Sequence, residues 1–147
     1  MFVHIRKKQY LCAHHFKFIT MMQIGLTHRS SAIVSAETTA IHIGSGDMAV
    51  WATPAMLSLM ENAAMLAVRD ALAEGQTTVG GHIESSHLRP SAVGAHVYAT
   101  AELTAMEGRK LHFHVAAYQQ TPEGDVLLGE GTHLRFIVER EKFLAKI

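Results

Sequence analysis

A chain of 147 residues, 48% of them hydrophobic, is the size of one domain and can bury a substantial core. Thirteen basic and thirteen acidic residues cancel, so the basic excess typical of nucleic-acid binding is missing. The single cysteine, Cys12, excludes an internal disulfide and favours a reducing cytoplasm, and no apolar run approaches the length of a membrane span.

Residues 1–22 are predicted to form an extension outside the folded core. Basic residues precede a short apolar run, as in a secretory leader, but histidines and a lysine interrupt the run. Two adjacent methionines at the end of this segment offer a second start. We expect the folded domain to occupy residues 23–139, followed by a charged tail, residues 140–147, that forms a short helix or a frayed end.

The first predicted elements are one or two strands within residues 23–43, where β-branched and polar residues mix, followed by a turn at Gly44–Asp47. A helix comes next, with Thr53 as its cap, a proline at its first position and Gly75 as its stop. Between 55 and 68 this helix is apolar almost all round, which is typical of a helix buried on most sides.

The remainder of the chain predicts antiparallel strands, because apolar residues alternate and turn residues separate the segments. The predicted strands cover residues 77–87, 95–106, 111–117 and 126–138. One long helix and one antiparallel sheet give a two-layer α+β fold, with the curved sheet wrapped around the central helix.

Glu61 is the only charged side chain between Asp47 and Arg69, within an otherwise apolar helix. Burying an unpaired carboxylate costs several kcal/mol, so Glu61 is expected to be paired, protonated or at a cavity. The alternative is that it lies on the one exposed stripe of the helix, beside Ser58 and Asn62.

Two further residues have side chains suited to chemistry. Thr53 is explained by helix capping, although a helix N-terminus also presents free N–H groups to an anion or a carbonyl oxygen. His87, at a strand end, suits proton transfer near neutral pH, although most histidines are structural or solvated. Gly80 and Gly81 indicate a bulge or a close approach of the backbone to a ligand.

The eleven histidines raise the question of a metal. His112 and His114 share a predicted strand face and His14 and His15 are adjacent, but neither pair matches a zinc spacing with a third ligand nearby. The sequence therefore predicts neither a metal site nor a cofactor.

An ordered set of short motifs resembles the fluoroacetyl-CoA thioesterase-like branch of the hotdog superfamily. The motifs are Ala52-Thr53-Pro54, Met60-Glu61, Thr78-Val79-Gly80, Ser86-His87-Leu88, Gly94, and Gly131-Thr132-His133 with Arg135-Phe136. The resemblance implies a hotdog fold, a homodimer or a dimer of dimers, and active sites near the dimer interface. It also implies hydrolysis of a small or medium acyl-CoA, in which CoA is part of the substrate, by a Thr53, Glu61 and His87 set.

The same resemblance implies substrate-binding roles for Gly80, through its backbone N–H, and for Arg135, while Arg89 is a further candidate for the CoA phosphates. The fluoroacetyl-specific member carries an aromatic lid upstream of its threonine, whereas residues 43–51 here contain no phenylalanine. A different or broader acyl group is therefore expected. The sequence does not decide whether Glu61 or Thr53 attacks the thioester or whether a water is activated.

Three other functions are alternatives to thioester hydrolysis. A hotdog module that binds acyl-CoA without hydrolysing it would keep the pocket and not need Glu61. A hydratase or dehydratase would show an Asp/His pair on its helix, and that pattern is missing. A purely structural or interaction domain fits the ordinary composition and balanced charge of the chain.

Overall fold

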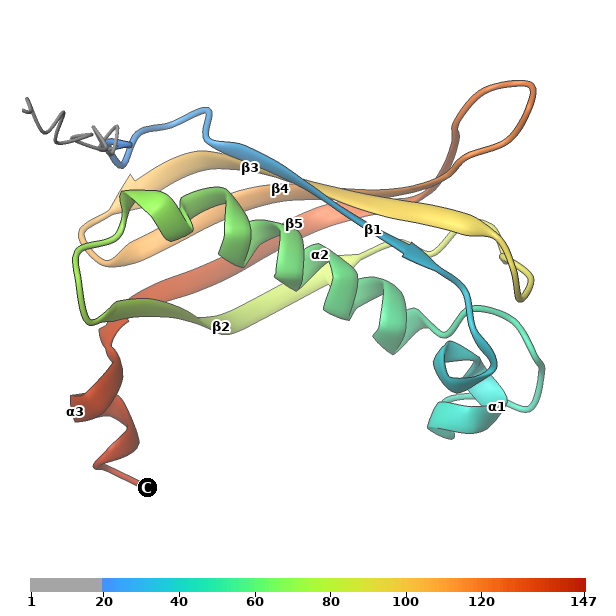
Figure 1. Ribbon diagram of the computed structural model, residues 1–147, viewed down its shortest axis with the longest axis horizontal. Coiled ribbons are helices and arrows are strands. Elements are labelled where there is room, and N and C mark those ends of the chain that lie inside the picture. Colours follow the sequence, from blue (N-terminus) through green and yellow to red (C-terminus); the bar gives the residue numbers. More distant parts are fainter. Residues whose placement is uncertain (1–19) are drawn as a thin grey trace, which may run out of the picture.

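The computed structural model describes residues 20–147, and in this range one helix lies along one face of a five-stranded sheet (Figure 1). The strands are β1 (Thr27–Ile33), β2 (Gln76–Ser85), β3 (His96–Glu107), β4 (Lys110–Gln119) and β5 (Val126–Glu139). The helices are α1 (Ala40–Ile43), α2 (Thr53–Val68) and α3 (Arg140–Leu144), with 3₁₀ turns at Ala36–Thr38 and Arg69–Ala71. All strand pairs are antiparallel in the order β1-β3-β4-β5-β2, which confirms the predicted fold class.

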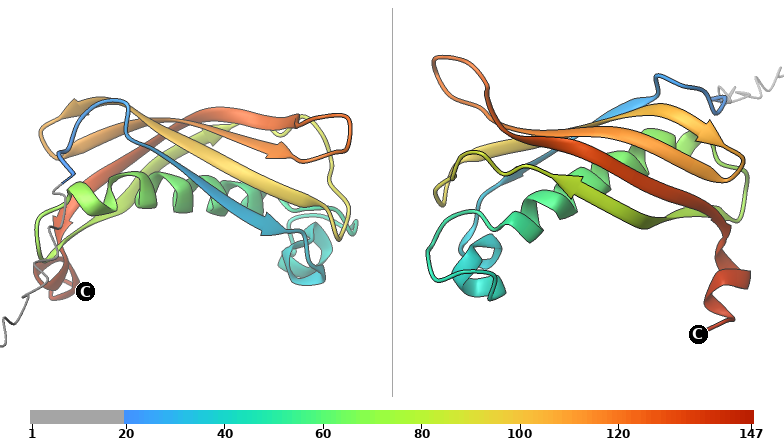
Figure 2. Two further views of the ribbon diagram at one scale, coloured as in Figure 1. Left: turned by 45° about the horizontal axis from the view of Figure 1, so that its top comes forward. Right: turned by 180° about the vertical axis from the view of Figure 1, so that it is seen from behind.

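Period-two alternation on β3 and β4 builds the inner face of the sheet, which curves over α2 (Figure 2). The side chains that this alternation points at the helix are buried: Val97, Ala99, Ala101, Leu103, Leu111, Phe113, Val115 and Ala117. The helix contributes Met56, Met60, Ala63, Ala64 and Val68, which recur at helical spacing. Burial of each larger side chain contributes roughly 1.5–3 kcal/mol.

The start of α2 differs from the sequence prediction. Ala52, not Thr53, is the N-cap residue, and no side chain caps the helix. The prediction that Thr53 caps the helix is therefore wrong, and its hydroxyl is free to face another element. The helix also ends at Val68, before the predicted stop, because a 3₁₀ turn intervenes and Gly75 instead makes the positive-φ turn that leads into β2.

Residues 38–43, which looked strand-like, form a helical turn instead. Thr39 Oγ1 accepts a hydrogen bond from the backbone N–H of His42, and Gly44 closes the turn with a φ of 85°. Local capping at both ends outweighs the β-branched composition of this segment. The prediction of one strand upstream is confirmed by β1.

Strands β2 and β5 approach each other closely at the predicted glycine pair. Their register shifts between Gly80 and His82, so the predicted bulge is present. The ring of Phe136 on β5 covers Gly81, where a Cβ would overlap it. Gly80 is the neighbouring residue that remains open toward α2.

The C-terminus lies away from the centre of the sheet, beyond α3 (Figure 1). Residues 1–19 of the predicted extension lie outside the described residues, while Met22 and Leu26 pack against the core. The tail carries the short helix α3, one of its two predicted forms. No helix within residues 20–147 has the length and apolarity needed to cross a membrane.

Candidate active site

The first part of the candidate site joins the start of α2 to the segment after β2. Thr53 Oγ1 and His87 Nδ1 lie 2.7 Å apart, at hydrogen-bond distance, although 34 positions separate them in the sequence. The rings of His87 and Trp51 are nearly perpendicular, with centroids 6.5 Å apart and an interplanar angle of 84°. The structure thus brings together two of the three residues predicted to be reactive.

The environment of His87 favours a neutral imidazole. Burial lowers the pKa of His87 below its ordinary value, and the nearby backbone of Arg89 offsets this only in part. Within residues 20–147 the buried Nε2 has no hydrogen-bond partner. A neutral ring that contacts a hydroxyl through one nitrogen is suited to general-base chemistry.

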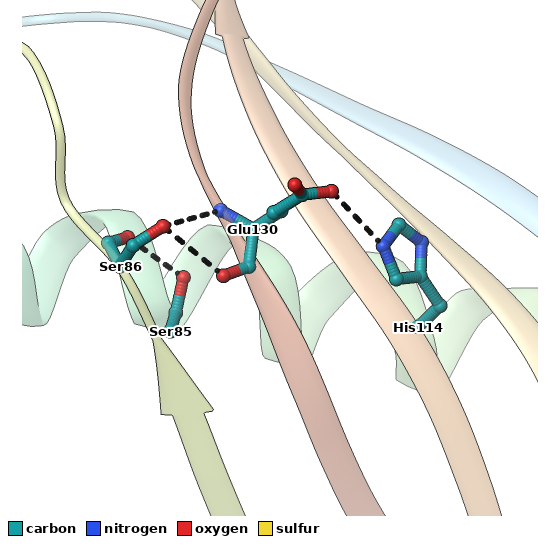
Figure 3. A network of polar contacts seen from close by, with 4 residues as sticks. All are labelled: Ser85, Ser86, His114 and Glu130. Carbon is teal, nitrogen blue, oxygen red and sulfur yellow. Dashed lines mark hydrogen bonds and ion pairs between the residues drawn. The ribbon is translucent and has the colours of Figure 1, made fainter.

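Ser86, the residue before His87 in the chain, is hydrogen-bonded to Glu130 of β5 (Figure 3). Its hydroxyl donates to the carbonyl of Glu130 at 3.2 Å and accepts from the Glu130 N–H at 3.2 Å. The backbone N–H groups of Ser86 and Leu88 also donate to β5 carbonyls, at 3.0 and 2.6 Å. His87 is therefore fixed on both sides by bonds to β5, which the sequence did not reveal because they join distant strands.

A cavity of about 270 Å³ opens beside the Thr53–His87 pair. Ala40 and Ser45, from α1 and the turn after it, form one wall, while Trp51 and the segment that includes Arg89 complete it. The Arg89 side chain is exposed at this pocket. The cavity has both apolar and polar lining next to a candidate base.

Glu61 lies in a second cluster, on the flank of α2 that faces β2 and β5. Its carboxylate packs on Gly80, where a Cβ would lie 3.5 Å from Oε1, and Oε2 lies 4.0 Å from Arg135 Nη1. The Glu61 side chain is 44% exposed while that of Arg135 is 7% exposed. Glu61 is thus both paired and accessible, which combines the two alternatives that its sequence pattern left open.

Within one chain these two clusters do not meet. Thr53 and Glu61 are eight residues apart on α2, which corresponds to roughly 12 Å along the helix axis. Among residues 20–147, the charged contact of Glu61 is with Arg135, and it has no hydrogen bond to Thr53 or His87. The three predicted reactive residues are therefore divided between two ends of one flank.

Other histidines pair with carboxylates on the far face of the sheet. His112 Nε2 lies 3.2 Å from Glu107, and His114 Nε2 lies 3.3 Å from Glu130 (Figure 3). Among residues 20–147, no group of three or more His, Cys, Asp or Glu side chains is placed to hold a metal ion.

Comparison with known proteins gives a consistent set of relatives. The family described as fluoroacetyl-CoA-specific thioesterase matches residues 34–141. The fluoroacetyl-CoA thioesterase of Streptantibioticus cattleyicolor is 38% identical over 98 residues, which cover 67% of this chain and 68% of that protein.

Solved structures agree with this match. A structure of the fluoroacetyl-CoA thioesterase superposes with a TM-score of 0.78 at 31% identity, covering 86% of this chain and 96% of that one. A thioesterase superfamily member from Thermus thermophilus superposes with a TM-score of 0.76 at 27% identity, covering 84% and 89% of the two chains. These neighbours confirm the hotdog fold that the sequence motifs predicted.

Proposed function

Since this chain belongs to the family of the fluoroacetyl-CoA-specific thioesterase, we propose that it hydrolyses small or medium acyl-CoA thioesters with Thr53, Glu61 and His87. Thioester hydrolysis is the activity that its relatives support. The observation that carries the assignment of residues is the 2.7 Å contact between Thr53 and His87, next to a cavity that opens to the surface.

The first step is addition of an oxygen nucleophile to the thioester carbonyl. In the tautomer with its proton on Nε2, His87 accepts a hydrogen bond from the Thr53 hydroxyl through Nδ1, and so increases the nucleophilicity of that oxygen. Alternatively Glu61 activates a water or attacks directly to form a transient anhydride. In each route the carbonyl electrons move onto oxygen.

The second step expels CoA. The oxyanion would be held by the Gly80 N–H, and removal of such a donor typically costs roughly 3–4 kcal/mol of transition-state stabilisation. Collapse breaks the carbon–sulfur bond. In the Thr53 route, protonated His87 gives the departing thiolate the proton that it took from the Thr53 hydroxyl, and water then hydrolyses the acyl ester left on Thr53. In the Glu61 routes, water either adds directly to the carbonyl or hydrolyses the anhydride, and its proton passes to the thiolate. The products are a free acid and CoA in each case. Arg89, exposed at the cavity, would meet the CoA phosphates, and Arg135 would hold Glu61 in place.

The two clusters require a partner subunit to form one site. Strand β2 is an edge of the sheet, and an edge strand can pair with its copy across a two-fold axis. That pairing places two copies of β2 and α2 antiparallel, so Glu61 of one copy approaches Thr53 and His87 of the other. Leu57 and Met65 are half-buried apolar residues four positions either side of Glu61, on the same flank of α2, and they support such a homodimer.

A thiol-release assay tests the proposal. With acetyl-, short-chain, aromatic and haloacyl-CoA, the wild type should release CoA, and Glu61→Gln and His87→Ala should each lower kcat by about a hundredfold or more. Both variants should melt as the wild type does. Matched controls on the far face of the sheet, Glu84→Gln and His112→Ala, should keep their activity.

Three outcomes would count against the proposal. Near-wild-type hydrolysis by both Glu61→Gln and His87→Ala would end the assignment of residues. Saturable binding of acyl-CoA without thiol release would favour the non-catalytic module. Loss of enoyl absorbance with an enoyl-CoA, without thiol release, would favour a hydratase.

A further inference from the structure

Two polar residues on β5 point into the protein, where apolar side chains are expected. Along this strand Leu134 and Phe136 lie on the outer face, while His133 and Arg135 face α2 with 2% and 5% of their surface exposed. Buried polar groups persist only where hydrogen bonds compensate the lost hydration. The hydrogen-bond partners of His133 and Arg135 therefore indicate the role of these two side chains.

The contacts of His133 fix its tautomer. Nδ1 lies 2.7 Å from the backbone carbonyl of His82, which can only accept, so Nδ1 carries the proton. Burial lowers the pKa of His133, an effect opposed by the His82 carbonyl and reinforced by Arg135, so the ring is neutral near pH 7. Nε2 then has a lone pair, and Arg135 Nη1 donates to it at 3.1 Å.

These bonds hold the Arg135 guanidinium in one plane. Nε donates to Thr78 Oγ1 at 2.8 Å, and Nη2 donates to the Thr78 carbonyl at 2.9 Å. Nη1, which His133 orients, is also the nitrogen that lies 4.0 Å from Glu61 Oε2. Of the groups that bind the guanidinium, His133 is therefore the one that orients Nη1, the nitrogen facing Glu61.

We infer that His133 is a positioning residue for thioester hydrolysis, whose Nε2 lone pair orients Arg135 so that the Glu61 carboxylate stays against Gly80. The inference rests on the proposed function, because it matters for turnover only if Glu61 takes part in the reaction. The titratable and charged groups around His133 are Glu61 on α2, Arg135 on β5 and His82 on β2, while β4 contributes the Phe113 ring at 6.3 Å.

A matched pair of amide variants separates this role from a merely structural one. His133→Gln places an amide oxygen near the former Nε2 and keeps an acceptor for Arg135. His133→Asn places its amide near the former Nδ1, so it keeps the donor to the His82 carbonyl and loses the acceptor for Arg135. A role in anchoring β2 alone would therefore be rescued by Asn, and a role in orienting Arg135 by Gln.

We expect His133→Asn to lower kcat by about tenfold to a hundredfold, with KM within about twofold of the wild type, and His133→Gln to stay within about threefold in kcat. His112→Asn and His112→Gln, on the outer face of β4, are the controls and should behave as wild type. The opposite order of the two His133 variants would overturn the inference. So would a rise in KM alone, since Arg135 would then serve substrate binding.

If the His133 variants fail to fold, a measurement on the unaltered protein still tests the inference. Long-range ¹H–¹⁵N correlation spectra at pH 7 should show His133 as the neutral Nδ1–H tautomer, and an Nε2–H tautomer or an imidazolium would overturn the inference. Kinetic measurements also distinguish a failure of the His133 inference from a failure of the proposed function. If Glu61→Gln is inactive while His133→Asn and His133→Gln are equally active, only the inference fails. Activity in Glu61→Gln would overturn both.

Discussion

At the scale of single residues, the neutral state of His87 sets the pH dependence of turnover. A base works only unprotonated, and burial lowers the pKa of His87 below its ordinary value of 6.5. As the pH falls, His87 therefore stays neutral until below 6.5 and protonates only there. We expect kcat/KM to be flat near pH 7 and to decline on the acid side with an apparent pKa below 6.5. A pH–rate profile with a saturating thiol probe measures this, and an acid limb centred above 6.5 would contradict it.

Residue by residue, sequence reasoning could identify chemical types but not their partners. Glu61 stood out because a charge in an apolar helix needs an explanation, and Arg135 and Gly80 supply it. The capping role predicted for Thr53 is wrong, because Ala52 is the N-cap residue, while the reactive role that the resemblance implies stays a prediction. Ser86 and His133 were missed as positioning residues, since their bonds reach the backbones of Glu130 and His82 across strand pairs that no local pattern specifies.

At the scale of elements, the β2–β5 pair depends on Gly81 having no side chain. A Cβ there would lie 2.9 Å from Phe136 Cδ2 and closer still to Cε2. We expect Gly81→Ala to lower the free energy of unfolding by about 1–3 kcal/mol, as overpacking does. In a Phe136→Ala background most of that loss should vanish. Urea denaturation of the four proteins gives the coupling energy, and simple additivity would show that the two residues do not interact.

The neighbouring glycine provides the comparison for that experiment. A Cβ at Gly80 would make only ordinary contacts, 3.4 Å from His133 and 3.5 Å from Glu61. Gly80→Ala should therefore unfold close to the wild type while its methyl group disturbs the Glu61 carboxylate. A stability loss equal to that of Gly81→Ala would mean that the bulge as a whole, not the Phe136 ring, demands glycine.

The helices and strands differ in whether a long sequence pattern or a few local hydrogen bonds determine them. Strands β3 to β5 were predictable because apolar and polar residues alternate along them, and helix α2 because a proline start and a long apolar run are typical of a buried helix. The segment at residues 38–43 was not, because a Thr39 hydroxyl and a Gly44 turn override composition over so short a stretch. The end of α2 shifted for a similar reason, since a 3₁₀ turn at Arg69–Ala71 precedes Gly75.

At the scale of the whole molecule, a single chain does not bring the proposed Thr53, Glu61 and His87 set together. The sheet covers one side of α2 and leaves the other side open (Figure 2). Glu61 lies on the flank next to this open side, roughly 12 Å along the helix from Thr53. Within one chain Ser58 and Asn62 are exposed and several apolar side chains of α2 are only half-buried, so the predicted burial on most sides is met in part. A second copy packed over the open flank would bury the rest of α2. The same interface would bring Glu61 of one copy to Thr53 and His87 of the other.

Subunit mixing tests this assembly directly. If Glu61 of one chain serves Thr53 and His87 of its partner, a dimer of one Glu61→Gln chain and one His87→Ala chain has one site with both defects and one intact site. Random mixing of the two inactive variants makes about half of the dimers mixed, so activity should recover to about a quarter of the wild type. Thiol release after co-refolding measures the recovery, and light scattering confirms the dimer. Each variant mixed with itself is the control and should stay inactive. If all three residues of a site came from one chain, every site in the mixed dimer would carry one defect, and no activity would return.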